Sequence, residues 1–199
     1  MQYFSTLPKI IQTDSNKNSV IVTNLLARAS ILPKVLLNPM IYYTYDIQDG
    51  DTPEIIAHKY YGDSYRYWVI LFANQLLDPQ WNWPMNGQVF NSYLTDKYGN
   101  TDIYNTVHHY EQVTTQLDVS TNITTVNTIT IDEDTYNSLV TSTSNVTLPT
   151  GTVTVTVTKN AVSIYNYELE TNESRRNIRI MNNNYVGQLE KEFQKLMAK

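Results

Sequence analysis

The chain has 199 residues, a net charge of −5 at pH 7 and no cysteine. Its length suits one or two domains. The acidic balance argues against a nucleic-acid partner, because that affinity comes largely from Lys and Arg neutralising phosphates. Without cysteine, disulfides and thiolate chemistry are excluded. Residues 1–7 hold no basic leader and no segment has the roughly 20 apolar residues of a membrane span, so we expect a soluble protein that is neither exported nor membrane-bound.

Residues 1–39 are expected to form an arm with a short helix. Between Val20 and Leu36, apolar residues recur at helical spacing until Pro33 ends the pattern: Leu25, Leu26, Ala29 and Leu32. Such an arm orders against a neighbouring protein, because so few apolar groups do not offset a backbone entropy of about 1 to 2 kcal/mol per residue. The alternative, a helix packed on the chain's own core, applies best to residues 25–37.

Residues 40–112 predict a strand followed by two short helices. Tyr43, Tyr45 and Ile47 alternate on one strand face, and Asp49-Gly50 predicts a tight turn. Asp51 or Thr52 is expected to cap a helix that begins near Pro53 and ends at Gly62. Its expected buried stripe is Ile55, Ile56 and Tyr60.

A second helix is expected from Asp63 or Ser64 to Asn74. A Trp-rich loop follows at residues 76–85, and residues 90–98 return to helical spacing. The strand that closes this strand–helix–helix unit is expected at Tyr104 to Glu111, where apolar and polar residues alternate.

Residues 113–167 predict an antiparallel β-subdomain in which Thr and Val alternate, with one apolar face and one threonine face. Turns are expected between Leu148 and Gly151 and at Lys159-Asn160. The exposed edges of such a sheet are available for pairing with another chain.

Residues 168–199 predict an extended segment, 177–180, and then a docking helix. The helix stripe is expected to comprise Val186, Leu189, Phe193 and Leu196. Arg175 and Arg176 lie beside two glutamates; a solvated turn is favoured over intersubunit ion pairs, which contribute about 0 to 1 kcal/mol when exposed.

Catalytic and metal-binding patterns are weak. His108 and His109 are adjacent on an expected strand and would point to opposite faces, and His58 lies on a helix. Asp132-Glu133-Asp134 lacks the ligand spacing of a calcium loop. We expect no catalytic residue, no metal and no cofactor, and therefore no enzyme.

The segment from Tyr45 to Asn74 resembles the LysM signature. The resemblance rests on Gly50-Asp51-Thr52, Ile56-Ala57, Tyr61-Gly62 and the helix-ending Asn74. It implies an α+β fold with a LysM-like β-α-α-β core, to which this chain adds the N-terminal helical arm, the Thr/Val-rich antiparallel β insertion and the C-terminal helix. It also implies a possible groove for N-acetylglucosamine polymers, formed by Asp51, Thr52, Pro53, Asn74, Gln75 and Leu76.

A narrower resemblance covers the first half and the last sixth of the chain. The segments that carry it are 25–29, 32–34, 50–54, 67–68, 77–79, 81–84 and 170–176. Together they resemble the baseplate wedge protein of T4-type contractile phage tails, whose members carry a LysM-like domain. The resemblance implies a structural virion protein, assembled in the host cytoplasm, that holds neighbouring wedges together near the hub of a sixfold baseplate.

Two functions follow from these patterns, and we favour the first. The first is a structural baseplate component whose partners are other wedge and hub-proximal tail proteins; the alternative is a module that binds peptidoglycan. With 16 Tyr against 4 Phe, aromatic side chains of the type enriched at interfaces dominate. The expected interface residues are Leu25, Leu26, Tyr60, Tyr61, Tyr65, Tyr67, Trp68, Trp81, Trp83 and Phe193.

Overall fold

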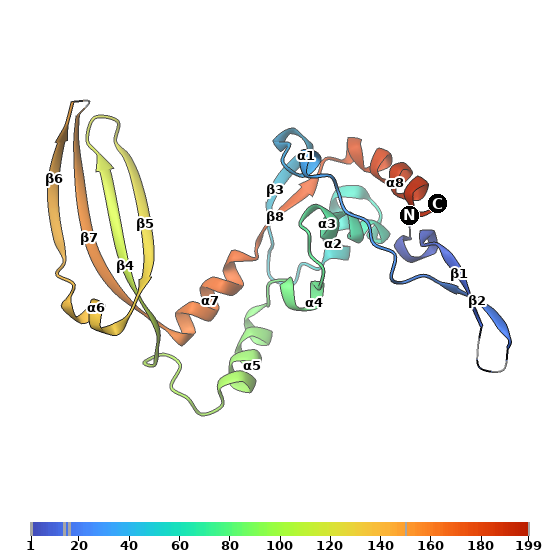
Figure 1. Cartoon of the computed structure of the whole chain (residues 1–199), viewed down its shortest axis with the longest axis horizontal. Helices are drawn as coiled ribbons and strands as arrows, with labels where there is room; N and C mark the ends of the chain where they lie inside the picture. The colour runs from blue at the N-terminus through green and yellow to red at the C-terminus, as the bar shows by residue number, and fades with distance from the viewer. Residues whose placement is uncertain (1, 14, 16, 150, 199) are drawn as a thin grey trace. The chain divides into compact units, whose positions relative to one another are not determined.

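The computed structural model describes residues 2–13, 15, 17–149 and 151–198, except for the side chain of Trp81. The fold is mixed α+β with antiparallel sheets (Figure 1). Its contacts group into two compact units, which we call the first unit (residues 1–90 and 172–199) and the second unit (residues 91–171). The division into segments 1–39, 40–112, 113–167 and 168–199 stays a prediction.

The centre of the first unit is a two-stranded sheet with two helices between its strands in sequence. β3 (Tyr42–Asp46) pairs antiparallel with β8 (Asn177–Met181), so that Tyr42 lies opposite Met181. The helices are α2 (Pro53–Tyr61) and α3 (Tyr67–Ala73), joined by the short 3-10 helix η3 (Ser64–Arg66). The element order is therefore β-α-α-β, with a long excursion before the last strand.

The expected closing strand at Tyr104 to Glu111 is wrong. Residues 107–118 form β4 of the second unit, and the strand that pairs with β3 is β8. β8 is better suited to this place, because its apolar residues Ile178, Ile180 and Met181 are almost completely buried, whereas the segment 104–111 has Val107 as its single aliphatic residue.

The ends of α2 follow the local signals in the sequence. The Thr52 side chain accepts a hydrogen bond from the N–H of Ile55, and Gly62 at φ +68° ends the helix. The buried residues of α2 are Ile56, Ala57 and Tyr61, while Ile55 and Tyr60 are exposed. The expected stripe was therefore wrong at two positions, because the helix turns the Ala57–Tyr61 side toward the core.

Asn74 ends α3, as expected, and also joins it to β8. Its side-chain amide donates to the carbonyls of Ile70 (2.9 Å) and Arg179 (2.8 Å), and its oxygen accepts from the N–H of Arg179 (2.8 Å). All three hydrogen bonds are made within the first unit, so this side chain is committed to the fold.

The N-terminal segment differs from the expected arm. β1 (Lys9–Thr13) and β2 (Ser19–Thr23) pair antiparallel as a hairpin, and the short helix α1 (Pro33–Leu36) begins at Pro33, where the expected helix would end. The run of β-branched residues 20–23 favours a strand, and Pro suits the first position of a helix. Two 3-10 helices, η1 (Tyr3–Thr6) and η2 (Pro39–Ile41), flank this region.

The last helix, α8 (Asn183–Met197), packs on the same core. It buries Val186, Phe193 and Met197, whereas the expected Leu196 is exposed. The Phe193 ring lies 5.1 Å from Trp68 and 5.2 Å from Tyr3. The N-terminal η1 and the C-terminal helix therefore share one aromatic cluster.

The second unit is built on a four-stranded antiparallel sheet with the order β5-β4-β7-β6. The strands are β4 (Val107–Asp118), β5 (Ile123–Ile131), β6 (Ser142–Leu148) and β7 (Gly151–Ser163). The reversal between Leu148 and Gly151 is confirmed, since these two residues pair. The turn expected at Lys159-Asn160 is wrong, because both residues pair with β4 inside the long strand β7.

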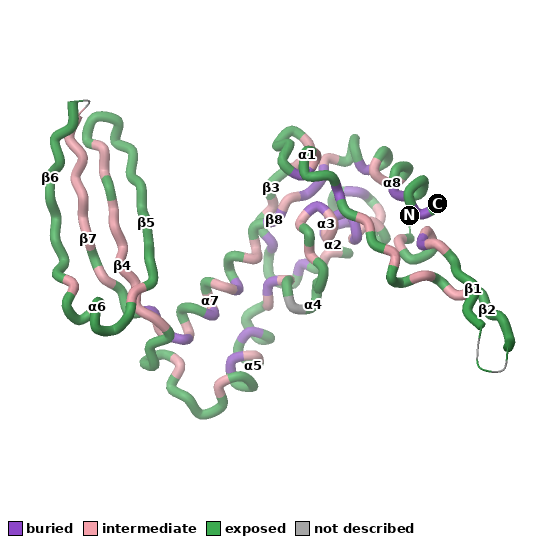
Figure 2. Tube along the Cα trace, in the orientation of Figure 1, coloured by how far each residue is buried: buried purple, intermediate pink, exposed green. Residues whose placement is uncertain are grey.

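Short helices complete the chain. α4 (Pro79–Asn82) lies in the first unit, α5 (Gly87–Tyr98) and α7 (Ile164–Ser174) each extend from one unit into the other along the chain, and α6 (Glu133–Ser138) connects β5 to β6. The two outer strands β5 and β6 are exposed along almost their whole length, and the central strands are mostly half-buried (Figure 2). The uniformly apolar face expected for this sheet is wrong, because Val155 of β7 lies beside Gln116 of β4.

Candidate interaction site

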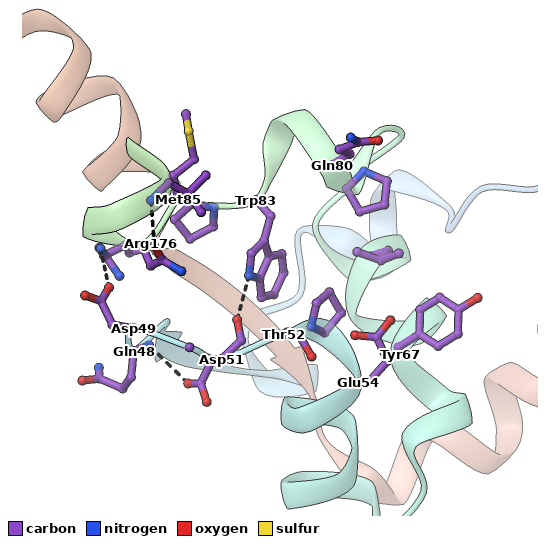
Figure 3. Close-up of a pocket in the computed structure, with 17 residues that line it drawn as sticks. Gln48, Asp49, Asp51, Thr52, Glu54, Tyr67, Gln80, Trp83, Met85 and Arg176 are labelled. Carbon is purple, nitrogen blue, oxygen red and sulfur yellow. Dashed lines mark hydrogen bonds and ion pairs between the residues drawn. The ribbon is translucent and has the colours of Figure 1, made fainter. Parts of the chain in front are cut away.

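Three segments that are far apart in sequence line one groove in the first unit. They are the turn 48–54, the segment 79–89 with Trp83, and Arg176 after α7, and the groove has a volume of about 510 Å³ (Figure 3). Tyr67 and Leu71 of α3 complete its wall. The turn, the Trp-containing segment and the segment 170–176 are the same motifs on which the phage-protein resemblance rests, so the structure brings those motifs together.

Asp51 organises the turn from a buried position. Its carboxylate accepts hydrogen bonds from the Tyr45 hydroxyl, from Lys59 Nζ (2.7 Å) and from the Gln48 N–H (3.2 Å). Burial raises the pKa of Asp51, but the hydrogen bonds from Lys59 and Tyr45 outweigh it and hold the pKa below its usual value. The carboxylate is therefore charged near neutral pH, and it lacks the raised pKa that a general acid needs.

Two contacts fix the segment 83–86, one to this turn and one to α7. Trp83 Nε1 donates to the backbone carbonyl of Asp51 at 2.9 Å. Asn172 is almost completely buried, and its amide donates to the Met85 carbonyl (3.0 Å) while its oxygen accepts from the Met85 N–H (2.7 Å). Both backbone groups of Met85 are thus satisfied by one side chain.

Arg176 also lines the groove and places a positive charge there. Its guanidinium bonds Glu173 (2.6 Å), Asp49 (2.8 Å) and the carbonyl of Ile47 (3.1 Å). The hydrogen bond that Arg176 donates to Glu173, with the one it donates to Asp49, raises the pKa of Arg176 above its usual value. The solvated turn favoured for this arginine is therefore wrong, because Arg176 is bound within its own unit.

The residues expected to form a glycan groove are only half assembled. Asp51, Thr52 and Pro53 line the groove of Figure 3, whereas Asn74, Gln75 and Leu76 are not among its lining residues. Trp83 and Pro84 lie there in addition. The Thr52 side chain caps α2 and the Asn74 amide joins α3 to β8, so both polar side chains are already engaged.

The expected interface residues fall into a buried, an exposed and a half-buried group. Tyr61, Trp68 and Phe193 lie in the core of the first unit, where their side chains leave little surface for a partner. Leu25, Leu26, Tyr60 and Tyr65 are exposed. Tyr67 and Trp83 are half-buried, and the side chain of Trp81 lies outside the described residues.

Five exposed apolar residues lie between residues 25 and 40, before and after α1 in the sequence, and we call them the leucine surface. Its members are exposed by 68 to 85%: Leu25, Leu26, Leu32, Leu37 and Met40. It borders an apolar groove of about 460 Å³ lined by residues including Ile31, Val35 and Leu189. The sequence does not single out Leu37 and Met40 as surface residues, and it places Leu32 on the face of an expected helix over residues 20–36, most of which is not helical in the structure.

A second buried carboxylate, Glu168, lies in the second unit. It accepts hydrogen bonds from Tyr98 (2.6 Å), Lys97 (2.7 Å) and Tyr93 (3.2 Å), which join α7 to α5. Burial raises its pKa, but Lys97 and Tyr98 outweigh burial and lower it. Sequence reasoning missed this cluster, because its members are about 70 residues apart.

The described residues give little support for a metal site or a membrane-spanning helix. Among them, no three His, Cys, Asp or Glu side chains are grouped so as to hold a metal ion. The His108 ring stacks on Tyr167 at 3.8 Å. No helix in the described part of the chain has the length and apolar character needed to cross a membrane.

Comparison with known proteins gives one clear result. The family model described as base plate wedge protein 53 matches residues 3–196, nearly the whole chain. A search of curated proteins finds no match.

Proposed function

Since the chain belongs to the family of base plate wedge protein 53, and is thus a structural protein of the phage tail baseplate, we propose that it joins neighbouring wedge subunits through its first unit. The contacts would be made by the leucine surface and the N-terminal hairpin. Their partners would be other wedge proteins and hub-proximal tail proteins in a sixfold assembly.

The leucine surface is the observation that carries this proposal. Full burial of one Leu or Met side chain stabilises by about 1.5 to 3 kcal/mol, and this segment leaves five of them exposed within 16 residues. Large exposed apolar areas mark sites of association, so we propose that this segment contacts a partner. The β1–β2 hairpin adds to the argument, since an isolated two-stranded hairpin is marginally stable until it packs on something else.

We further propose that the β-α-α-β core serves as a LysM-like packing module. The antiparallel β3–β8 pair with α2 and α3 between its strands supports this proposal. The chain's own Trp83 lines the groove beside the turn and donates a hydrogen bond to the Asp51 carbonyl. That contact favours a module that packs protein segments over the alternative, one that binds peptidoglycan.

The electrostatics of the two buried carboxylates support a role that does not involve catalysis. Asp51 and Glu168 each bond a lysine and at least one tyrosine hydroxyl, and each has a lowered pKa. These are the features of ion pairs that hold segments together.

Coexpression with the other wedge proteins of the same phage tests the proposed role. We expect wild type to copurify with them in stoichiometric amount on size exclusion, and the double variant Leu26→Asp/Leu37→Asp to be lost from the complex. Leu77→Asp is the matched control, because Leu77 is an equally exposed leucine (87%) outside the leucine surface. The proposal fails if wild type copurifies with none of the wedge proteins, or if the double variant copurifies as well as the control does.

A further inference from the structure

The outer edge of β5 is unusually open for a natural sheet. All nine residues of β5 pair with β4 on one side, and within the described residues no strand pairs with the other side (Figure 1). Ile123, Val126 and Ile129 are exposed. Natural edge strands are usually protected by charge, Pro, a bulge or short length, and β5 carries none of these within its regular nine-residue pairing.

The two ends of β5 are symmetric about Asn127. In an antiparallel pair of two copies centred there, Ile123 would lie opposite Ile131 and Thr124 opposite Thr130, while Thr125 would lie opposite Ile129 and Val126 opposite Thr128. Every position except the central Asn127 is β-branched, which is the residue type that packs best across strands. No charged residue would meet its own copy.

We propose that β5 pairs antiparallel with β5 of a second copy of this chain, with the two-fold axis at Asn127. The two four-stranded sheets would then form one sheet of eight strands, and the open edge would be removed. This pairing involves the second unit only and does not depend on the leucine surface, so it stands or falls separately from the proposed wedge contacts.

The other outer strand, β6, fits a second copy less well. β6 has seven residues, and pairing about Asn145 would set Ser142 against Leu148 and Ser144 against Val146, so that only Thr143 and Thr147 would match. In addition, the Asn145 side chain already accepts a hydrogen bond from Thr154 at 2.9 Å. β5 is longer, and the residue pairs at its two ends match, so it is the better candidate for pairing with its own copy.

Cysteine trapping tests the register directly, because the natural chain has no cysteine. Asn127→Cys places one thiol opposite its copy at the two-fold axis, where directly paired Cβ atoms lie about 4.5 to 5.5 Å apart. We expect mild oxidation of the full chain to give a disulfide-linked dimer. Ser144→Cys on β6 is the control and is expected to remain monomeric. Cross-linking of both variants alike, or of Ser144→Cys alone, would overturn the proposal.

Sedimentation velocity of the purified chain, without other baseplate proteins, gives the second measurement. We expect a concentration-dependent dimer for wild type and for Ser144→Lys. Asn127→Lys sets two like charges directly opposite each other, so its dimer is expected to be at least about tenfold weaker. A wild type that stays monomeric at every concentration shows that the edge pairs with another protein or with nothing, and this outcome overturns the proposal. Circular dichroism checks that each variant keeps the sheet.

Discussion

Trp83 donates its indole N–H to the backbone carbonyl of Asp51, 2.9 Å away and 32 residues earlier in the chain. The carboxylate of the same Asp51 holds Lys59 and Tyr45. One residue thus fixes the turn through its side chain and the Trp-containing segment through its carbonyl. The neighbouring Asn172–Met85 pair fastens that segment to the C-terminal part of the first unit.

We expect Asn172→Ala to destabilise the first unit by about 2 to 4 kcal/mol. The substitution leaves the N–H and the carbonyl of Met85 without their partner, and each unsatisfied buried group costs about 1 to 3 kcal/mol. Urea unfolding followed by tryptophan fluorescence measures this, because Trp68, Trp81 and Trp83 all belong to the first unit.

Gln80→Ala is the matched control for that experiment. Gln80 is also an amide residue near the groove, but it is exposed, so we expect a change within about 0.5 kcal/mol. Equal stability of Asn172→Ala and the control would show that the Met85 contacts contribute nothing to the first unit.

The Glu168 cluster makes the stability of the second unit depend on pH. The pKa of Glu168 in the folded chain is below its usual value, so its contribution is present above the unfolded pKa of about 4.3 and is lost as the pH falls through the folded pKa. We expect Glu168→Gln to cost about 1 to 3 kcal/mol at pH 7. The difference between wild type and variant should shrink toward zero below about pH 4.

Urea unfolding followed by far-UV circular dichroism at several pH values measures this difference, with tryptophan fluorescence as the separate report on the first unit. Glu192→Gln provides the control, since Glu192 pairs with Lys195 on the exposed face of α8. An exposed pair contributes about 0 to 1 kcal/mol, so its curve should follow wild type. A Glu168→Gln difference that stays constant from pH 7 to pH 3 would contradict the assigned ion pair.

The short-range features of the fold were predictable from sequence. The Thr52 cap, the Gly62 stop and the helix end at Asn74 each depend on residues within one or two turns, and the structure confirms them. The strands of the second unit were equally readable, because β-branched residues alternate over long runs.

Long-range pairing was not predictable. β3 pairs with β8, about 130 residues later, and no local pattern in the sequence indicates which distant segment a strand pairs with. The joint between Asn172 and Met85 was missed for the same reason, since an 87-residue separation leaves no periodic signal. The N-terminal helix was misplaced because leucines at helical spacing outweighed the strand preference of residues 20–23.

Peptidoglycan binding is the function that the turn residues alone would favour, and we expect it to be absent. Two of the groups that a sugar would need are engaged inside the chain, since Trp83 bonds the Asp51 carbonyl and the Asn74 amide bonds Ile70 and Arg179. A pull-down on purified peptidoglycan should therefore retain neither wild type nor Thr52→Arg.

The folding of Thr52→Arg must be checked in this pull-down, because Thr52 caps α2 and losing such a cap costs about 0.5 to 2 kcal/mol. Thr52→Ser keeps a capping hydroxyl and is the matched control. Retention of wild type and Thr52→Ser, abolished in a folded Thr52→Arg, would mean that a glycan displaces Trp83 from Asp51. The β-α-α-β core would then act as a sugar-binding module, and the leucine surface would be left to account for assembly.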